Sequence, residues 1–248
     1  MFIDAHCHIH SHDYPDKEGA YNRAQEANVT KMICVGTTTA DSHEAISFSE
    51  AHSGVYAAIG VHPHEAKDNQ GASRELESVL DQAVAIGEVG LDYYYEHSDR
   101  SIQQKVLEEF LQLAQDHKKP VIFHVREAFN DFWPIFENFT NITGVLHSFT
   151  DYMKNAEKAL SHGLYLGING IATFTKDIDQ VALYRSRPLE SILLETDAPY
   201  LTPKPLRGTL NEPAYVQLVG TWLSEQTNTP VEEIAQQTTH NATILFNL

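Results

Sequence analysis

Short apolar runs rich in β-branched residues alternate with helical stretches along the whole of this 248-residue chain. Eight runs have the length and composition of buried strands, and they span residues 1–6, 31–35, 55–61, 84–88, 121–125, 144–147, 164–168 and 192–195. The clearest helical stretch between them is 102–118, where Val106, Phe110 and Leu113 belong to an apolar stripe at i, i+3, i+4 spacing. Eight strand–helix units in about 250 residues favour a parallel (β/α)8 TIM barrel over an open doubly wound sheet. We therefore expect an α/β protein with one domain, the barrel, over residues 1–248.

The composition and net charge of the chain limit the kinds of molecule that it can attract. With 42% hydrophobic and 21% charged residues the chain has the composition of a folded globular protein. Its net charge of −17 opposes long-range attraction to nucleic acid and to anionic membranes, so a polyanionic substrate must be held by local positive charge. We expect no signal peptide, no membrane segment and no obligate protein partner, which makes the cytoplasm the predicted location. Two cysteines, Cys7 and Cys34, are interpreted as packing thiols.

Histidine pairs follow two of the expected strands. Side chains alternate across a strand, so His6 and His8 point to one side while Cys7 points to the other. His62 and His64 repeat this spacing after the third strand, beside a proline that stiffens the loop. Both pairs have the spacing of metal chelators.

Six of the eight expected strands end in titratable residues, and a TIM barrel places its catalytic groups at these carboxyl ends. A single His or acid there is more often a cap or a solvated group than a metal ligand. Together, however, the buried groups would be costly to desolvate without a cation. The predicted ligands are His6, His8, Glu88, His124, His147 and Asp197. Their mixed N and O donors suit two divalent ions such as Mg, Mn or Zn, with Glu88 able to bridge them.

In this order, the motifs resemble those of the TatD family of metal-dependent hydrolases, which includes deoxyribonucleases. The resemblance covers nearly the whole chain. It depends on residues 4–8 (DAHCH), 60–64 (GVHPH), 87–92 (GEVGLD), 120–126 (PVIFHVR), 146–149 (LHSF), 194–201 (LETDAPYL) and 211–213 (NEP). It implies a (β/α)8 fold, metal binding by the six residues named above, and hydrolysis of DNA as a 3' to 5' exonuclease. It also implies a substrate-side role for His62 and His64 and matches Arg126 to the family's strand-five arginine.

Two segments depart from the family pattern. Ser148 to Asp151 stand where Cys-Phe-Ser-Gly is common, and Arg207 to Leu210 lack a basic pair often found before Asn-Glu-Pro. Neither departure touches a predicted ligand, so both bear on the grip on a single-stranded DNA substrate and not on the metal chemistry.

The predicted roles follow from chemistry. Asp197 is expected to bind metal and accept the proton of the attacking water, and Arg126 to hold phosphate bidentately. We count Asp197, Glu88, His62 and Arg126 as catalytic, and His62, His64 and Arg126 as substrate-binding. Asp4 and Asp92 are expected to accept hydrogen bonds from ligand N–H groups. Glu195 points the same way as Asp197 but lies one layer deeper in the barrel, and it is expected to stabilise the positions of the metal ligands.

The other aromatic residues and histidines are not assigned a catalytic or metal-binding role. Tyr93, Tyr94 and Tyr95 follow the Glu88 strand, where stacking on bases and packing against a loop are equally favoured. His10 and His12 are expected to be solvated loop residues. Trp133, Trp222 and the six histidines on predicted helices or connections are interpreted as structural or surface groups. Residues 198–213, which contain four prolines, are expected to form a long functional loop.

Two alternatives remain open at this point. A barrel with such ligands can hydrolyse a small amide, lactone or cyclic substrate, although many binuclear amidohydrolases use a modified lysine where this chain has Glu88. A non-catalytic metal-binding module is disfavoured, because a structural zinc site is closed by four ligands.

Overall fold

The computed structural model describes all residues, 1–248. Eight strands alternate with helices along the chain, and every pairing described is parallel, so the predicted (β/α)8 barrel class is confirmed. The strands are β1 (Phe2–Cys7), β2 (Val29–Val35), β3 (Val55–Ile59), β4 (Ala85–Asp92), β5 (Val121–Arg126), β6 (Gly144–Leu146), β7 (Tyr165–Ile168) and β8 (Ile192–Leu194). The chain divides into two compact units, Met1–Cys34 with Ser148–Leu248, and Val35–His147.

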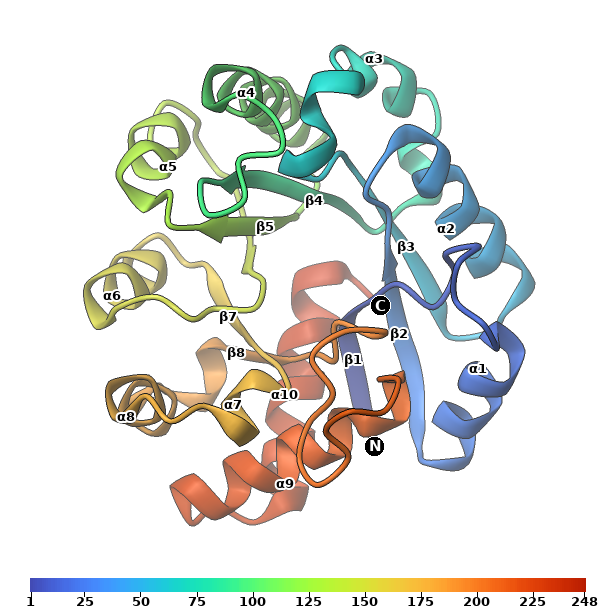
Figure 1. Ribbon diagram of the computed structural model, residues 1–248, viewed down its shortest axis with the longest axis vertical. Helices are drawn as coiled ribbons and strands as arrows, with labels where there is room; N and C mark the ends of the chain where they lie inside the picture. The colour runs from blue at the N-terminus through green and yellow to red at the C-terminus, as the bar shows by residue number, and fades with distance from the viewer. The chain divides into compact units, whose positions relative to one another are not determined.

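The first unit joins the two ends of the chain. β7 pairs with β8, β1 pairs with β2, and a parallel bridge between Cys7 and Ala198 links β1 to the segment after β8. Its helices are α1 (Lys17–Glu26), α6 (Met153–Ser161), α7 (Ile171–Phe174), α8 (Ile178–Ser186), α9 (Val216–Thr227) and α10 (Val231–Phe246). Helix α10 packs on β1 and β8 (Figure 1). This packing buries Ile234, Ala235 and Phe246.

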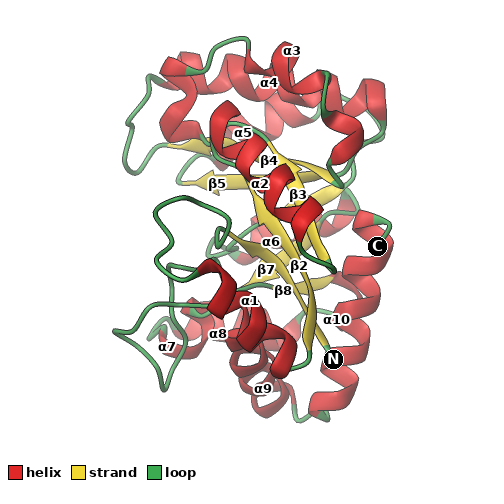
Figure 2. Cartoon of the chain, turned by 90° about the vertical axis from the view of Figure 1, so that its right-hand side faces the viewer, coloured by secondary structure: helices red, strands yellow, loops and turns green.

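The second unit contains the consecutive strands β3, β4, β5 and β6. Its helices are α2 (Thr39–Ala51), α3 (Ala72–Glu77), α4 (Arg100–His117) and α5 (Phe129–Phe136), with short 3₁₀ turns at Pro63–Asp68 and Leu80–Gln82. Figure 2 shows these helices in red and the strands in yellow. The apolar stripe predicted on 102–118 is buried and packs on β4 through α4.

Strand β4 is longer than the sequence pattern indicates. It continues through Val89 to Asp92 and is buried at all eight positions. Gly90 pairs with His124 of β5, and a Cβ atom on Gly90 would overlap the carbonyl oxygen of His124. Gly90 also has a φ of 155°, which side chains rarely adopt. The glycine therefore lets β4 approach the strand that carries His124.

Residues 198–212 form no helix or strand, as predicted, and Pro213–Tyr215 is a single 3₁₀ turn before α9. Cys7 and Cys34 are both buried with their sulfur atoms 4.0 Å apart, which agrees with their interpretation as packing thiols. None of the helices has the length and apolar character that crossing a membrane requires.

Candidate metal centre

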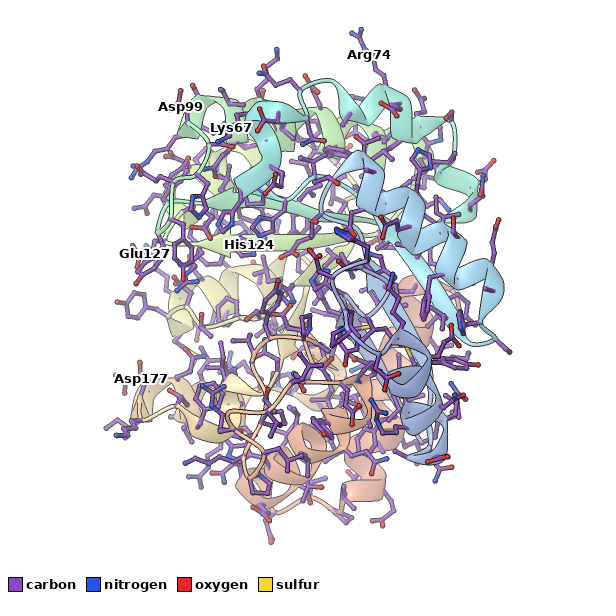
Figure 3. All side chains as sticks on the ribbon, turned by 45° about the vertical axis from the view of Figure 1, so that its right-hand side comes forward. Lys67, Arg74, Asp99, His124, Glu127 and Asp177 are labelled. Atoms are coloured by element: carbon purple, nitrogen blue, oxygen red, sulfur yellow. The ribbon has the colours of Figure 1, made fainter.

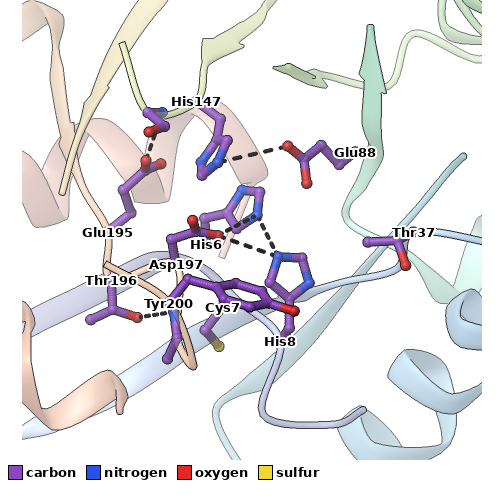
Figure 4. A network of polar contacts seen from close by, with 12 residues as sticks. His6, Cys7, His8, Thr37, Glu88, His147, Glu195, Thr196, Asp197 and Tyr200 are labelled. Carbon is purple, nitrogen blue, oxygen red and sulfur yellow. Dashed lines mark hydrogen bonds and ion pairs between the residues drawn. The ribbon is translucent and has the colours of Figure 1, made fainter. Parts of the chain in front are cut away.

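Three predicted ligands meet in the first unit. His6 and His8 lie at the end of β1, and Asp197 follows β8. The Nε2 atoms of His6 and His8 are 3.0 Å apart, and Asp197 Oδ1 lies 3.7 Å from the first and 3.4 Å from the second (Figure 4). All three side chains are at least mostly buried. Two imidazoles and one carboxylate thus direct their donor atoms at a common point.

Two buried carboxylates, those of Asp4 and Glu195, form hydrogen bonds next to this group of ligands. Asp4 accepts hydrogen bonds from the backbone N–H groups of His6 and Thr196, at 3.3 and 2.8 Å. Glu195 accepts one from the backbone N–H of Ser148 at 2.7 Å and lies 3.4 Å from Asn169 Nδ2. Asp4 therefore bonds to backbone groups beside the ligands and to the Thr196 hydroxyl rather than to imidazole N–H groups. Glu195 orders the loop after β6.

Glu88 is the centre of a second group, in the second unit. Its Oε1 atom lies 2.8 Å from His124 Nδ1, 3.8 Å from His62 Nε2 and 3.7 Å from His147 Nε2. His62 Nε2 and His124 Nδ1 are 3.2 Å apart. The structure thus brings Glu88, His124 and His147 together as the sequence predicts, and it adds His62 to the same group.

Asp92 orients His124. Its Oδ2 atom lies 3.0 Å from His124 Nε2 and 3.0 Å from His64 Nε2. Burial by itself would raise the pKa of Asp92, but hydrogen bonds from His124 and His64 hold that pKa well below its usual value of 3.8. An ionised Asp92 favours a proton on His124 Nε2, which makes the lone pair of Nδ1, on the side of Glu88, available to a metal ion. Figure 3 labels His124 on β5.

His62 differs from its neighbours in charge state. Burial, together with the nearby His124, lowers its pKa well below the usual 6.5, so it is neutral near pH 7. Its Nδ1 atom accepts a hydrogen bond from the backbone N–H of His64 at 3.1 Å. In the neutral ring the proton is then on Nε2, which makes this atom a hydrogen-bond donor rather than a metal ligand.

The two groups fit divalent cations. Donor atoms at 2.0–2.2 Å around a tetrahedral ion lie roughly 3.3–3.6 Å from one another. The donor separations are 3.0–3.7 Å for His6, His8 and Asp197, and Glu88 Oε1 lies 2.8 Å from His124 Nδ1 and 3.7 Å from His147 Nε2. Imidazole and carboxylate donors together suit Zn and other first-row divalent metals.

Arg126 lies on the exposed end of β5. Its guanidinium carbon is 4.2 Å from the centre of the Tyr94 ring and 4.9 Å from that of Tyr95. Tyr93, by contrast, is buried and donates a hydrogen bond from its hydroxyl to Asp131 at 2.8 Å, so it is a packing residue.

One sequence interpretation is wrong. His10 is 1% exposed, whereas a solvated loop residue was expected; its ring lies 6.3 Å from that of His8, because the turn after β1 folds inward. His12 is 76% exposed, as expected.

Two asparagines that the structure places beside the proposed ligands had no role predicted from the sequence. Asn169 follows β7 beside Glu195, and Asn211 donates to the carbonyl oxygens of Thr196 and Tyr200. The signal for Asn169 was its position as the polar residue that follows β7.

The remaining histidines and both tryptophans belong to helices, helix caps or connections. His43, His117 and His240 are on helices, and His52 and His162 cap helices. His97 is in a connection, although its ring contacts that of His64 at 4.6 Å. Trp133 packs within α5, and Trp222 of α9 contacts Tyr184.

A (β/α)8 fold that carries two sets of imidazole and carboxylate donors defines the class of metal-dependent hydrolases. A family model described as TatD related DNase matches residues 3–247. The chain belongs to the TatD family of metal-dependent hydrolases.

Relatives that match most or all of the chain are named as metal-dependent hydrolases or as TatD proteins. An uncharacterized metal-dependent hydrolase of Bacillus subtilis, YabD, is 34% identical over 255 residues and covers 100% of both chains. A protein of Pantoea ananatis named 3'-5' ssDNA/RNA exonuclease TatD is 35% identical over 249 residues, or 94% of each. The crystal structure of the TatD homolog YjjV from Escherichia coli matches with a TM-score of 0.93 at 30% identity, covering 100% of this chain and 98% of that one.

Proposed function

We propose that this metal-dependent hydrolase is a 3' to 5' exonuclease that cleaves phosphodiester bonds of single-stranded DNA. The observation that carries the proposal is the position of an exposed arginine, Arg126, two residues beyond the predicted ligand His124 on β5. The side chains of residues two apart on a strand point to the same face, so a phosphate bound by Arg126 lies toward the Glu88 group. The name of the Pantoea relative supports the same substrate class.

Six residues are proposed as metal ligands: His6, His8, Glu88, His124, His147 and Asp197. Two bound divalent ions would supply a water of lowered pKa and polarise the phosphate oxygens. The identity of the ions, among Mg, Mn and Zn, and their number are part of the proposal.

The remaining roles belong to side chains of the chain itself. Asp197, whose carboxylate is partly exposed, accepts the proton of the attacking water. His62 donates a hydrogen bond from Nε2 to a substrate oxygen, because its Nδ1 is already an acceptor. His64, held on Asp92, adds a second donor on the substrate side. Arg126 supplies the local positive charge that a chain of net charge −17 otherwise lacks.

We further propose that residues 1–248 act as one catalytic domain, consistent with a family match that spans 3–247. A cytoplasmic location stays a prediction, as does the absence of an obligate protein partner.

The test uses protein stripped with a chelator and reloaded separately with Mg, Mn or Zn. A single-stranded oligonucleotide labelled at its 5' end reports progressive shortening from the 3' end, and nucleotide analysis reports mononucleotide release. We expect release that needs metal and is lost in Asp197→Asn. If protein loaded with metal releases no nucleotide under any ion, the nuclease proposal is wrong, and hydrolysis of a small amide, lactone or cyclic substrate becomes the better hypothesis.

A further inference from the structure

Two tyrosine rings stand exposed immediately after β4. Tyr94 and Tyr95 are 54% and 51% exposed, although large aromatic rings usually bury more of their surface. They meet edge to face with ring centres 4.7 Å apart. An exposed pair of aromatic rings beside a predicted active site is typical of a surface that binds a ligand.

Arg126 lies across both rings. Its guanidinium carbon is 4.2 Å from the Tyr94 centre and 4.9 Å from the Tyr95 centre. A guanidinium stacked on a ring uses its flat face for that contact, and its N–H groups remain directed outward in its plane. The rings therefore restrain the Arg126 guanidinium, leave its N–H groups able to bind a phosphate, and add aromatic surface next to it.

A single carboxylate connects these rings with the proposed metal ligands. Asp92 Oδ1 accepts hydrogen bonds from the backbone N–H groups of Tyr94 at 3.0 Å and Tyr95 at 2.9 Å. Its other oxygen, Oδ2, faces His124 and His64. The backbone of the two tyrosines is thus fixed to the same residue that orients His124.

Histidine rings fill the space between the tyrosines and the Glu88 group. The ring of His64 lies 5.4 Å from that of Tyr95 and 6.2 Å from that of His124. Tyr95 is also parallel to His97, with centres 5.7 Å apart. His64 therefore lies between Tyr95 and His124, a member of the Glu88 group.

We propose that Tyr94, Tyr95 and Arg126 form a subsite for one nucleotide, with one tyrosine ring stacking on its base, the other ring packing against the edge of that base, and Arg126 binding its phosphate. This inference rests on the proposed function, which it deepens by assigning recognition of unpaired bases to named residues. A base presents its flat face only when it has left the duplex stack, so the subsite selects single strands. Because every base has such a face, the subsite accepts all four.

The test measures binding without hydrolysis. Metal-free protein in EDTA is titrated against a fluorescently labelled single-stranded oligonucleotide, and against the same oligomer with abasic sites in its last three 3' positions. The double variant Tyr94→Ala/Tyr95→Ala removes both rings, and Tyr94→Phe/Tyr95→Phe keeps them. Tyr152→Ala removes an 81% exposed tyrosine far along the chain and is the matched control.

We expect the double alanine variant to bind the normal oligomer roughly 5- to 150-fold more weakly, as alanine substitution at stacking residues does. Its affinity for the abasic oligomer, which wild-type protein already binds weakly, should change less than twofold. The phenylalanine variant and Tyr152→Ala should match wild type. An equal loss on both oligomers, or no loss on the normal one, overturns the subsite.

Failure of the subsite and failure of the proposed function give different results. If wild-type protein loaded with metal shortens the normal oligomer but the alanine variant binds as wild type does, the nuclease function stands and the subsite is wrong. If wild-type protein binds neither oligomer and shortens neither, the proposed function itself is wrong.

Discussion

Thr196 donates two hydrogen bonds to Asp4, a residue 192 positions earlier in the chain. Its backbone N–H bonds to Oδ1 at 2.8 Å, and its hydroxyl bonds to Oδ2 at 2.5 Å. Both residues are fully buried. Because Asp4 also accepts from the backbone of His6, one carboxylate holds the two chain segments that carry His6 and Asp197. The geometry of that ligand group depends on a contact between the first strand and the last.

Thr196→Val should destabilise the protein. The substitution preserves shape but leaves one buried oxygen of Asp4 without its hydroxyl donor, and the N–H of Ala198 loses an acceptor at 3.1 Å. A buried polar group that loses its partner costs about 1–3 kcal/mol, and we expect that decrease in the free energy of unfolding. Urea denaturation measures it, with the exposed Thr221→Val as control. A change under about 0.5 kcal/mol, the usual range for surface substitutions, would contradict the proposed importance of this contact.

Asp92→Asn should destabilise metal-free protein in a pH-dependent way. The pKa of Asp92 is lowered below 3.8, so its contribution is present above that pH and is lost as pH falls through the folded-state value. Burial by itself would lower the pKa of His124, but bonds to Asp92 and Glu88 raise it above 6.5. The contribution of His124 is therefore full below pH 6.5 and is lost as pH rises through its folded-state value.

The loss of unfolding free energy in Asp92→Asn should accordingly be largest between about pH 4 and 6.5, at about 1–3 kcal/mol, and smaller at about pH 9. Urea denaturation in EDTA at acidic, neutral and alkaline pH gives the three values. Asp81→Asn, on the protein surface, is the control. A difference between wild type and Asp92→Asn that is constant across this range would argue against the charged pair.

Gly90→Ala should lower stability more than an ordinary glycine substitution does. The new methyl group overlaps the carbonyl oxygen of His124 and adopts an unfavourable φ, for an expected cost of about 2–4 kcal/mol. Gly163→Ala is the matched control, since Gly163 also has positive φ but no atom within 4 Å of the added Cβ. Thermal or urea denaturation compares the two. Equal effects would show that backbone strain alone, without the overlap, accounts for the loss.

Substituting a ligand in one donor group should remove the metal of that group only. If each donor group binds one ion, His8→Ala and His124→Ala each lose about one equivalent, while His240→Ala, on helix α10, keeps both. Inductively coupled plasma mass spectrometry of dialysed protein counts the ions. Loss of all metal in either single variant would instead indicate that the ions bind only as a pair.

Much of the fold follows from local pattern. The eight strands, the helix α4 and the irregular loop after β8 were predictable because apolar periodicity is a property of neighbouring residues. Strand ends were less accurate: β4 continues to Asp92, where glycines interrupt the apolar pattern that marks a strand. His10 was misplaced for a related reason, because polar neighbours indicate a solvated loop but do not reveal how the turn folds.

The sequence by itself determined which candidate residues share a face, since strand alternation places His6 with His8 and His124 with Arg126 on one face whatever the surroundings. Only the tertiary structure decided which donor atoms meet. The contact of Asp4 with Thr196, the bonds from Asp92 to two histidines, and the stacking of Arg126 on Tyr94 depend on strand register and side-chain rotamers. These arise from packing among residues distant in the chain, and no local pattern encodes them.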